Sequence, residues 1–407
     1  MQTTPLAGRR IIELGTMLAA PFAAHILSQL GAEVIKVEPP TGDSTRSLVR
    51  GGPSGTFIAY SHGKKSVCID LSTPEGHSAL CALLKTADAL VHNLSPKAAR
   101  KLQLTREYCE ALNPKLIYCH IRGYAAGPQA DDLASNPVAE ASTGVMEGNR
   151  INGRPSRLGP SYHDQFAGAY AVIGILTSML QMQKGAAPQP VEIGLYETGL
   201  HLASRDLVGV QLKTQLLGRA EREPHGEFSM PGYGAYRSAD DRWIYLLMLT
   251  DSHWTKFCQA MGLPNDEAYA TLRQRKKVRE AVEELVRNTV VAHPFDDVIA
   301  RLKSVGMGFT EVLPLERVLD APQAQYPGKL RHMNFRGYAF DVPEFPRLNQ
   351  GKDDVATLPP PSLGEHTAAL LQAAGVTPAE YQSMLDAGAI AEASSDKCQW
   401  APVRREA

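Results

Sequence analysis

Short strand-like runs alternate with helix-like segments through the first half of this chain. The strand-like run at 9–14 precedes a helix-like segment at 20–31, and the alternating run from Ala32 to Glu38 follows. The rhythm continues with strand-like runs at 66–71, 89–94, 116–121 and 191–195 and helix-like segments at 74–85, 108–112 and 196–217. Strands that alternate with helices pair in parallel, because each crossover helix returns the chain to the same end of the sheet. The pattern predicts an α/β fold with a doubly wound, mostly parallel, Rossmann-like sheet.

A smaller unit of different character is predicted next. The polar segment Gly218–Met230 has the composition of a linker, and a second linker is expected near 322–327. Between them lie a strand-like run at 243–247 and helix-like segments at 252–261, 275–288 and 295–305. We therefore predict a large domain over 1–217, a smaller α+β domain over 218–327, and a C-terminal segment, 328–407, that returns to the large domain.

Composition excludes several classes of function. The 407 residues carry 42 Lys+Arg and 43 Asp+Glu, and no run of five like charges, so nucleic acid and anionic membrane are poor candidate partners. The six cysteines are scattered without a CxxC pair, and the histidines form no HExxH motif, so no metal site is expected. The N-terminus lacks a signal peptide, and no segment is expected to reach the length of a membrane span, which predicts a soluble, cytoplasmic protein.

One carboxylate stands at the start of an almost wholly apolar helix-like segment. Asp164 follows the helix breaker Gly159-Pro160 and precedes the apolar run from Ala167 to Leu180. The simplest interpretation is that Asp164 caps the helix N-terminus. A carboxylate there also feels the positive end of the helix dipole and stays ionised at neutral pH, as a nucleophile must. Both interpretations stay open at this point.

The familiar nucleotide motifs are missing. The turn after the first strand contains Gly15 but no GxGxxG, so NAD binding is not expected, although Glu38 occupies the place of a ribose-binding acid. The segment from Lys97 to Lys101 carries three cations that fit either phosphate binding or a solvated helix face. No P-loop and no GxSxG elbow occurs, which argues against kinase and hydrolase chemistry.

The chain resembles the class III CoA-transferases, which share their fold with the α-methylacyl-CoA racemases. The resemblance rests on motifs in the family's order across nearly the whole chain: Pro5–Gly8, Ala20–Ala23, Leu30–Pro40 with Gly42-Asp43, Lys65–Val67 through Asp70-Leu71, Asn113–Ile117, Asp164-x-x-x-Gly168 and Pro361–Thr367. It implies that Asp164 is a nucleophile that forms a mixed anhydride with the acyl group and then a thioester with CoA.

The resemblance also implies where the CoA substrate binds. Its contacts would be Met17, Leu18, Ala19, Ile69, Asp70, Leu71, Ser72, Asn93, Leu94 and Ser95, with Lys101 and Arg100 as phosphate-binding cations. Two features depart from the formyl-CoA transferases. Pro39 replaces an arginine after the second strand, and no glycine-rich loop occurs between Phe228 and Tyr236, so oxalate and formate are less favoured substrates.

Asn136, Glu140 and Tyr233 are candidate contacts for the acyl group. For Glu140 the alternative is a carboxylate on a helix surface. Ser135-Asn136-Pro137 stands where the racemases carry a catalytic histidine, which favours transfer over racemisation, although racemase or intramolecular isomerase activity is the alternative. We expect acyl-CoA and a small carboxylic acid as substrates, the acid being a C4–C5 dicarboxylate of the kind used by mesaconyl-type CoA-transferases. We also expect an interlocked homodimer of the family type.

Overall fold

The computed structural model describes residues 4–49, 53–218, 230–264, 266–346 and 358–393. By their contacts the residues form two compact units. The first comprises Met1–Glu147, Pro155–Val208 and Gly328–Ala407, and the second comprises Gly148–Arg154 and Gly209–Pro327. The predicted linker Gly218–Met230 lies almost wholly outside the described residues. The domain limits at 217–218 and 327–328 stay a prediction.

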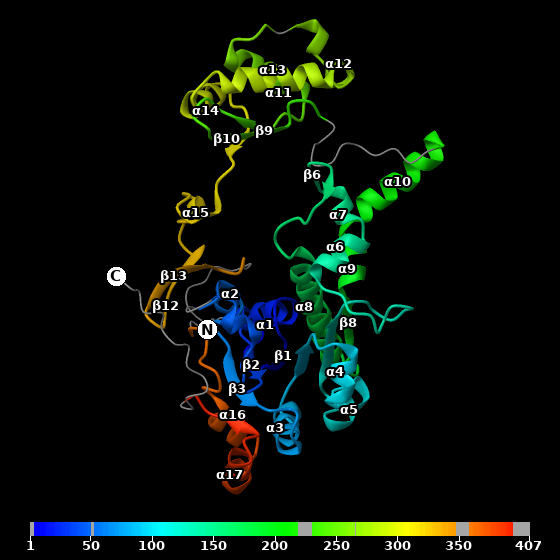
Figure 1. The fold of residues 1–407 in the computed structure, drawn as a ribbon, viewed down its shortest axis with the longest axis vertical. Helices are drawn as coiled ribbons and strands as arrows, with labels where there is room; N and C mark the ends of the chain where they lie inside the picture. The colour runs from blue at the N-terminus through cyan, green and yellow to red at the C-terminus, as the bar shows by residue number, and fades with distance from the viewer. Residues whose placement is uncertain (1–3, 50–52, 219–229, 265, 347–357, 394–407) are drawn as a thin grey trace. The chain divides into compact units, whose positions relative to one another are not determined.

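A seven-stranded sheet, in the order β14-β3-β2-β1-β4-β5-β8, forms the centre of the first unit (Figure 1). Its parallel strands are β1 (Arg10–Leu14), β2 (Glu33–Glu38), β3 (Lys65–Ile69), β4 (Ala89–His92), β5 (Ile117–Arg122) and β8 (Val191–Gly194). The short edge strand β14 (Ile390–Ala391), which the sequence did not indicate, pairs antiparallel with β3. The predicted α/β class and mostly parallel sheet are confirmed.

Successive side chains of each strand point to opposite faces of this sheet, because a strand has a two-residue period. Ile11 and Val34 pack with helices α1 (Ala19–Gln29) and α8 (Tyr162–Gln183) in one core. Ile12 and Ile35 pack in a second core with α3 (Pro74–Lys85), α5 (Arg106–Leu112), α16 (Thr367–Ala373) and α17 (Pro378–Asp386). Helices therefore cover both faces, which explains why most residues of these strands are buried.

The strand order reverses direction at one place. From β1 the chain passes to β2 and β3 on one side, and it then returns to place β4 on the other side of β1. In open parallel sheets, ligands bind outside the carboxyl ends of the strands at such a switch point. The topology therefore predicts a ligand site at the turn after β1 and the loop after β4.

Helix α8 corrects one expectation. It has 22 residues and is apolar enough to cross a membrane by length and composition, whereas no such segment was expected. Core helices of soluble proteins meet the same criterion. Ala167, Ala171 and Ile175 of α8 are fully buried in the core shared with α1 and the sheet, so the apolar character of this face has a packing role within the unit.

The second unit contains an antiparallel sheet in the order β11-β10-β9, formed by β9 (Gly234–Arg237), β10 (Trp243–Leu246) and β11 (Phe309–Glu311). Its core joins Ile244 and Leu246 to Trp254 and Phe257 of α11 (Asp251–Met261) and to Val286 of α13 (Arg279–Val291). Mixed strands and helices around one core agree with the α+β character expected of this segment.

The remaining elements are short or peripheral. They are α2 (Gly55–Ser61), α4 (Pro96–Lys101), α6 (Asn136–Ser142), α7 (Val145–Gly148), α9 (Leu195–Leu202), α10 (Ser204–Leu217), α12 (Leu272–Lys277), α14 (Phe295–Ser304), α15 (Leu315–Val318), β6 (Arg150–Ile151), β7 (Arg154–Pro155), β12 (Leu330–Phe335) and β13 (Tyr338–Pro343), with 3-10 turns at Ser44–Ser47 and Glu267–Tyr269.

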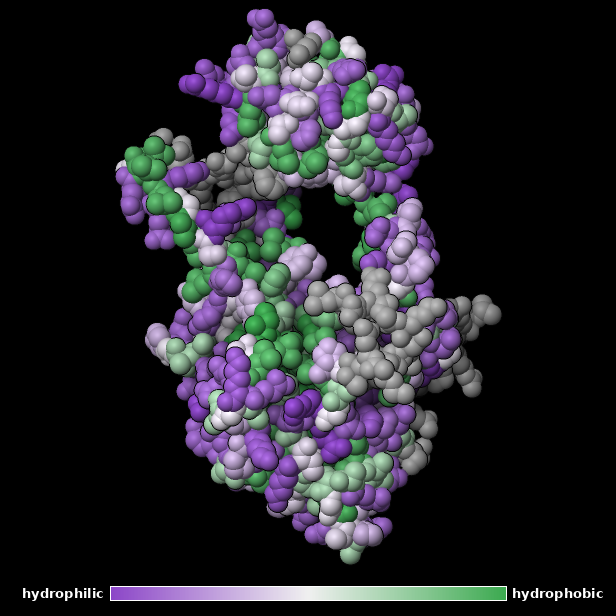
Figure 2. Space-filling view, turned by 180° about the vertical axis from the view of Figure 1, so that it is seen from behind, coloured by the Kyte–Doolittle hydropathy of each residue, from purple (hydrophilic) through white to green (hydrophobic). Residues whose placement is uncertain are grey.

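Apolar side chains also reach the surface of the single chain, where hydrophobic residues gather in patches between hydrophilic ones (Figure 2). On α8, Ile173 and Leu180 are 59% and 58% exposed, and on α10, Leu212 and Leu216 are 52% and 82% exposed. Large exposed apolar side chains in such numbers are typical of a surface that another chain covers.

Candidate active site

Asp164 lies in the first turn of α8, which begins at Tyr162. Its side chain is half-buried, and among the described residues none donates a hydrogen bond to its carboxylate. The N-cap position belongs to Ser161, whose side chain makes no capping bond. The interpretation of Asp164 as the helix cap is therefore wrong, because its carboxylate is not used by the backbone of α8.

A side chain from another helix caps α8 instead. The amide oxygen Oδ1 of Asn136, at the start of α6, accepts hydrogen bonds from the backbone N–H groups of His163 at 2.9 Å and Asp164 at 3.3 Å. These are two of the donors that a helix start leaves unpaired. Asn136 thus performs the capping role and leaves the Asp164 carboxylate available for chemistry.

Glu140, one turn further along α6, sets the orientation of that amide. Its Oε1 accepts from Nδ2 of Asn136, so Oδ1 of Asn136 must face α8. Its Oε2 accepts from the backbone N–H of Leu158 at 3.2 Å. Because Glu140 is 1% exposed, the interpretation as a surface carboxylate is wrong. Contact of Asn136 or Glu140 with a substrate stays a prediction.

Burial dominates the electrostatics of Asp164. Burial raises the pKa of the Asp164 carboxyl to about 6, and the positive charge of Arg157 opposes that rise. Arg157 is partly exposed and its Nε lies 3.8 Å from Oε1 of Glu140. The carboxylate is still mainly ionised at pH 7, as expected, but its pKa is raised rather than lowered. Nothing in the sequence around Arg157 distinguished it as a neighbour of Asp164.

Gly168 brings the start of α1 against α8, one helical turn after Asp164. A Cβ atom at Gly168 would lie 2.7 Å from the carbonyl oxygen of Ala19 and 3.0 Å from Cδ1 of Phe22. Only glycine allows this close approach of two helix backbones. Residues four apart share one face of a helix, so Asp164 lies on the side of α8 that faces the start of α1.

That turn, at the switch point of the sheet, contains the first group of predicted CoA contacts. Met17 has a left-handed φ of 63° and is 45% exposed, and Leu18 precedes the first residue of α1, the buried Ala19. The side chain of Asn93, after β4, donates to the carbonyl oxygen of Thr16 at 2.9 Å and accepts from its N–H at 3.0 Å. Asn93 thus bonds the residue before Met17, and contact of either segment with CoA stays a prediction.

The other predicted CoA contacts lie at the end of β3 and around α4. The segment 69–72 begins at the last residue of β3, which β2 separates from β1, and Asp70 accepts from the N–H and hydroxyl of Ser72. The Ser95 hydroxyl caps α4 by accepting from Ala98. At the other end of α4, Arg100 pairs with Asp131 at 3.1 Å and Lys101 is exposed. Their contact with CoA stays a prediction.

The structure also places Glu38 and Tyr233, two other residues that the sequence analysis named. Glu38 is buried and accepts from Nε and Nη2 of Arg46, both at 2.7 Å, so it is not a ribose-binding acid. Tyr233 belongs to the second unit, where its ring packs against Tyr245. Across the described ranges, no group of three or more His, Cys, Asp or Glu side chains is arranged to hold a metal ion.

Comparison with known proteins identifies relatives along most of the chain. The model of CoA-transferase family III matches residues 6–367. Succinyl-CoA–D-citramalate CoA-transferase of Chloroflexus aurantiacus is 30% identical, with 78% of this chain and 81% of that protein covered. Succinate–glutarate CoA-transferase of Agrobacterium fabrum is 28% identical, with 90% and 95% covered. The crystal structure of a CAIB/BAIF family protein from Brucella suis has a TM-score of 0.81 at 26% identity and covers 92% of this chain and 100% of that chain.

The contact between α1 and α8 generates a first prediction. Gly168→Ala is expected to lower the free energy of unfolding by about 1–3 kcal/mol, because the new methyl group overlaps the Ala19 carbonyl. Gly209→Ala in α10 is the matched control, since nothing lies within 4 Å of its Cβ position. Thermal melting measures both. An unchanged melting temperature for Gly168→Ala would contradict the prediction, because the two helices would then move apart to admit the methyl group without loss of stability.

The raised pKa of Asp164 generates a second prediction. A carboxyl group whose pKa is about 6 when folded and lower when unfolded makes the folded state bind more protons between these values. Stability is therefore lost as pH rises through that window. Asp164→Asn removes the titration and is expected to raise the free energy of unfolding by about 1–2 kcal/mol at pH 7.5 but little at pH 4.

Melting curves at both pH values test this expectation. The control is Asp240→Asn, because hydrogen bonds from Ser238 and the Phe295 N–H hold the pKa of Asp240 below its usual range. That control is not expected to gain stability. A gain for Asp164→Asn that is equal at both pH values would contradict the electrostatic origin.

Proposed function

Because the chain belongs to CoA-transferase family III, we propose that it moves CoA from an acyl-CoA thioester to a carboxylic acid through covalent intermediates on Asp164. The observation that carries this proposal is the state of Asp164. Its carboxylate is half-buried, mainly ionised at pH 7, accepts no hydrogen bond from the described residues, and is on the face of α8 that packs against the start of α1.

The reaction proceeds by exchange of acyl groups without net proton transfer. A carboxylate oxygen of Asp164 attacks the thioester carbon, the C–S bond breaks, and CoA departs as a thiolate. The thiolate attacks the Asp164 carbonyl carbon of the resulting anhydride, which releases the donor acid as a carboxylate and leaves an aspartyl-CoA thioester. The acceptor carboxylate then repeats both steps in reverse and regenerates Asp164.

The environment of Asp164 suits these steps in two ways. A raised pKa means a more basic carboxylate, and partial burial limits hydrolysis of the anhydride. The N–H groups of His163 and Asp164 are already bonded to Asn136, so they do not serve the anionic tetrahedral intermediates. We propose that Arg157, whose charge acts on the Asp164 carboxylate, offsets part of the negative charge in those intermediates.

The names of the relatives guide the proposal for substrates. The two relatives described above are named for succinyl-CoA with D-citramalate and for succinate with glutarate. We propose that this chain also acts on short dicarboxylic acids and their CoA thioesters. The acceptor is best identified by offering succinyl-CoA with a panel of C4–C6 acids and detecting new acyl-CoA by mass spectrometry. Transfer only to monocarboxylic acids would refute the proposed acid class.

Racemisation is the weaker alternative for this site. It requires an acid and a base on opposite faces of the α-carbon. Asn136 occupies the place of the racemase histidine, and its amide is engaged with α8 and Glu140. The neighbouring His163 is 1% exposed and its Nε2 lies 3.4 Å from the Thr143 hydroxyl. Neither side chain is arranged to move a proton to and from a substrate carbon.

We also propose that the chain acts as a homodimer of the interlocked family type. The exposed apolar side chains of α8 and α10 support a partner chain over these helices. Sedimentation as a monomer at micromolar concentration would contradict this assembly.

The covalent mechanism generates a third prediction. Asp164→Ala is expected to lower exchange of labelled CoA between acids by at least a thousandfold, because no other carboxylate replaces the nucleophile. In the wild-type enzyme, hydroxylamine added during turnover is expected to convert Asp164 to a hydroxamate, detected by peptide mass spectrometry. Asp131→Ala, in an exposed ion pair with Arg100, is the control for trapping and is expected to leave the Asp164 modification in place.

The pKa of Asp164 generates a fourth prediction. Protonation removes the nucleophile, so kcat/KM is expected to fall tenfold per unit as pH drops below about 6. Arg157 lowers this pKa, so Arg157→Met is expected to move the acid limb to higher pH. Arg106→Met, which removes an exposed cation paired with Glu110, is the control and is expected to leave the limb in place. An acid limb that Arg157→Met leaves unmoved would contradict the assignment.

A further inference from the structure

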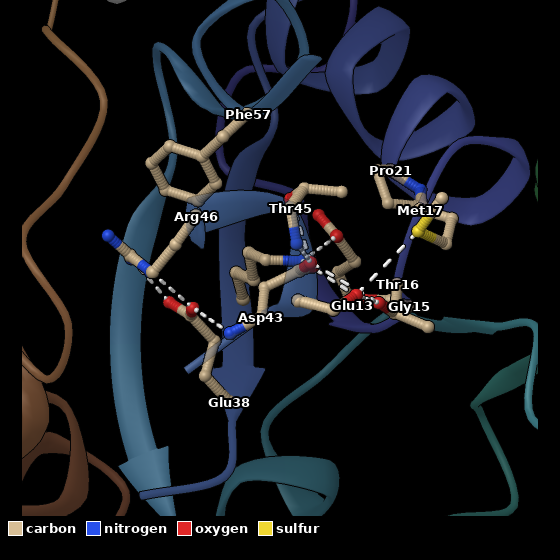
Figure 3. A network of polar contacts seen from close by, with 12 residues as sticks. Glu13, Gly15, Thr16, Met17, Pro21, Glu38, Asp43, Thr45, Arg46 and Phe57 are labelled. Carbon is tan, nitrogen blue, oxygen red and sulfur yellow. Dashed lines mark hydrogen bonds and ion pairs between the residues drawn. The ribbon is translucent and has the colours of Figure 1, made fainter. Parts of the chain in front are cut away.

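Six charged side chains are buried together at the carboxyl ends of β1 and β2. They are three acids and three bases, with side-chain exposures of 6% or less: Glu13, Lys36, Glu38, Asp43, Arg46 and Lys64. Figure 3 shows part of this network between Arg46 and Phe57 on one side and the turn residues Gly15, Thr16, Met17 and Pro21 on the other. The formal charges balance, so the network is neutral as a whole.

Two lysines connect this network to the turn between β1 and α1. Nζ of Lys36 donates to the carbonyl oxygen of Gly15 at 2.8 Å, where the turn begins. Nζ of Lys64 donates to the carbonyl oxygen of Pro21 at 2.9 Å, in the first turn of α1. Both lysines also pair with Glu13, at 2.8 Å and 2.5 Å. One buried carboxylate therefore couples the two ends of the turn.

Two further attachments restrain the middle of the turn. Lys36 pairs with Asp43 at 2.6 Å, and the Thr16 hydroxyl donates to Asp43 at 3.2 Å. The backbone of Thr16 is bonded on its other side by Asn93. Between these attachments Met17 keeps its left-handed φ of 63°. Such a conformation costs a non-glycine residue about 1–2 kcal/mol, so the surrounding bonds must maintain it.

Stability alone is a poor explanation for these charges. Burial lowers the pKa of Lys64 to about 8 in spite of the facing Glu13 carboxylate, which indicates that charging this lysine is costly. Apolar residues of similar volume commonly replace buried ion pairs with no loss of stability. An apolar replacement would, however, leave the carbonyl oxygens of Gly15 and Pro21 without these partners.

We propose that the buried pair Glu13–Lys64, together with Lys36, positions the turn from Gly15 to Pro21 to receive the CoA portion of the substrate. This inference rests on the proposed function, because it assigns CoA to the switch point of the sheet. Glu13, Lys36 and Lys64 are positioning residues: the two lysines bond the turn, and Glu13 pairs with both lysines. The network holds both ends of the turn, and α8 holds the first residue of α1 through Gly168.

The test compares two neighbouring lysines of the same strand region. Lys64→Met removes the bond to Pro21, whereas Lys65→Met removes a partly exposed pair with Glu33 at 2.6 Å that does not touch the turn. Calorimetric titration with CoA is expected to give a Kd at least tenfold higher for Lys64→Met and within twofold of wild type for Lys65→Met. The KM for acyl-CoA is expected to rise more than kcat falls.

Thermal melting accompanies each titration, so that binding is compared only between folded proteins. If Lys64→Met does not fold, the double variant Glu13→Met with Lys64→Met is measured in its place, because it leaves the remaining four charges balanced. A folded variant of either kind that binds CoA with wild-type Kd overturns the proposal. Failure of both to fold also overturns it, since the network would then serve stability itself.

The readout separates this inference from the proposed function. CoA binding by a wild-type protein that transfers no CoA would refute the proposed catalysis and leave the comparison of the two lysines valid. A wild-type protein that binds no CoA would refute the proposed function itself.

Discussion

The close packing of α1 on α8 at Gly168 is the contact on which the candidate site depends. It places the backbone of Ala19 where any side chain at position 168 would collide. Through it, the start of α1 and the N-terminal part of α8 become neighbours although about 150 residues of chain separate them. Without this approach, the predicted nucleophile and the switch point of the sheet would be two unrelated features of one unit.

The acids of this unit show how partners, and not burial alone, decide the state of a carboxylate. Glu38 is fully buried, yet Arg46, Lys36 and Ser66 together outweigh burial and lower its pKa. Asp164 is less buried, and among the described residues only the charge of Arg157 opposes burial, so the pKa of Asp164 rises. A buried carboxylate that accepts several hydrogen bonds and ion pairs has a structural role. A partly buried carboxylate that accepts no hydrogen bond is reactive. This contrast singles out Asp164 more sharply than its position at a helix start.

Local periodicity predicted most elements of the fold, because the helices and strands follow patterns that neighbouring residues set. The segment 74–85 was expected as a helix and is α3, and the run expected at 116–121 overlaps β5 to within one residue at each end. Contacts between residues that are far apart in the sequence could not be predicted from local periodicity. The cap of α8 comes from Asn136, the charges of Lys36 and Glu38 in an alternating strand are buried instead of solvated, and β14 reaches the sheet from the end of the chain. No local pattern contains these partners.

The sequence by itself determined the α/β class, the family resemblance and the identity of the candidate nucleophile, since each depends on residue order and on motifs within short segments. Only the tertiary structure decided that Asn136, oriented by Glu140, caps α8 in place of Asp164. It also decided that the charge of Arg157 acts on Asp164, and that Glu13 links two lysines to one turn. The physical reason is distance along the chain. Hydrogen bonds and charges act through a few ångströms of space, and only folding brings residues 13, 64, 136 and 164 within that range of their partners.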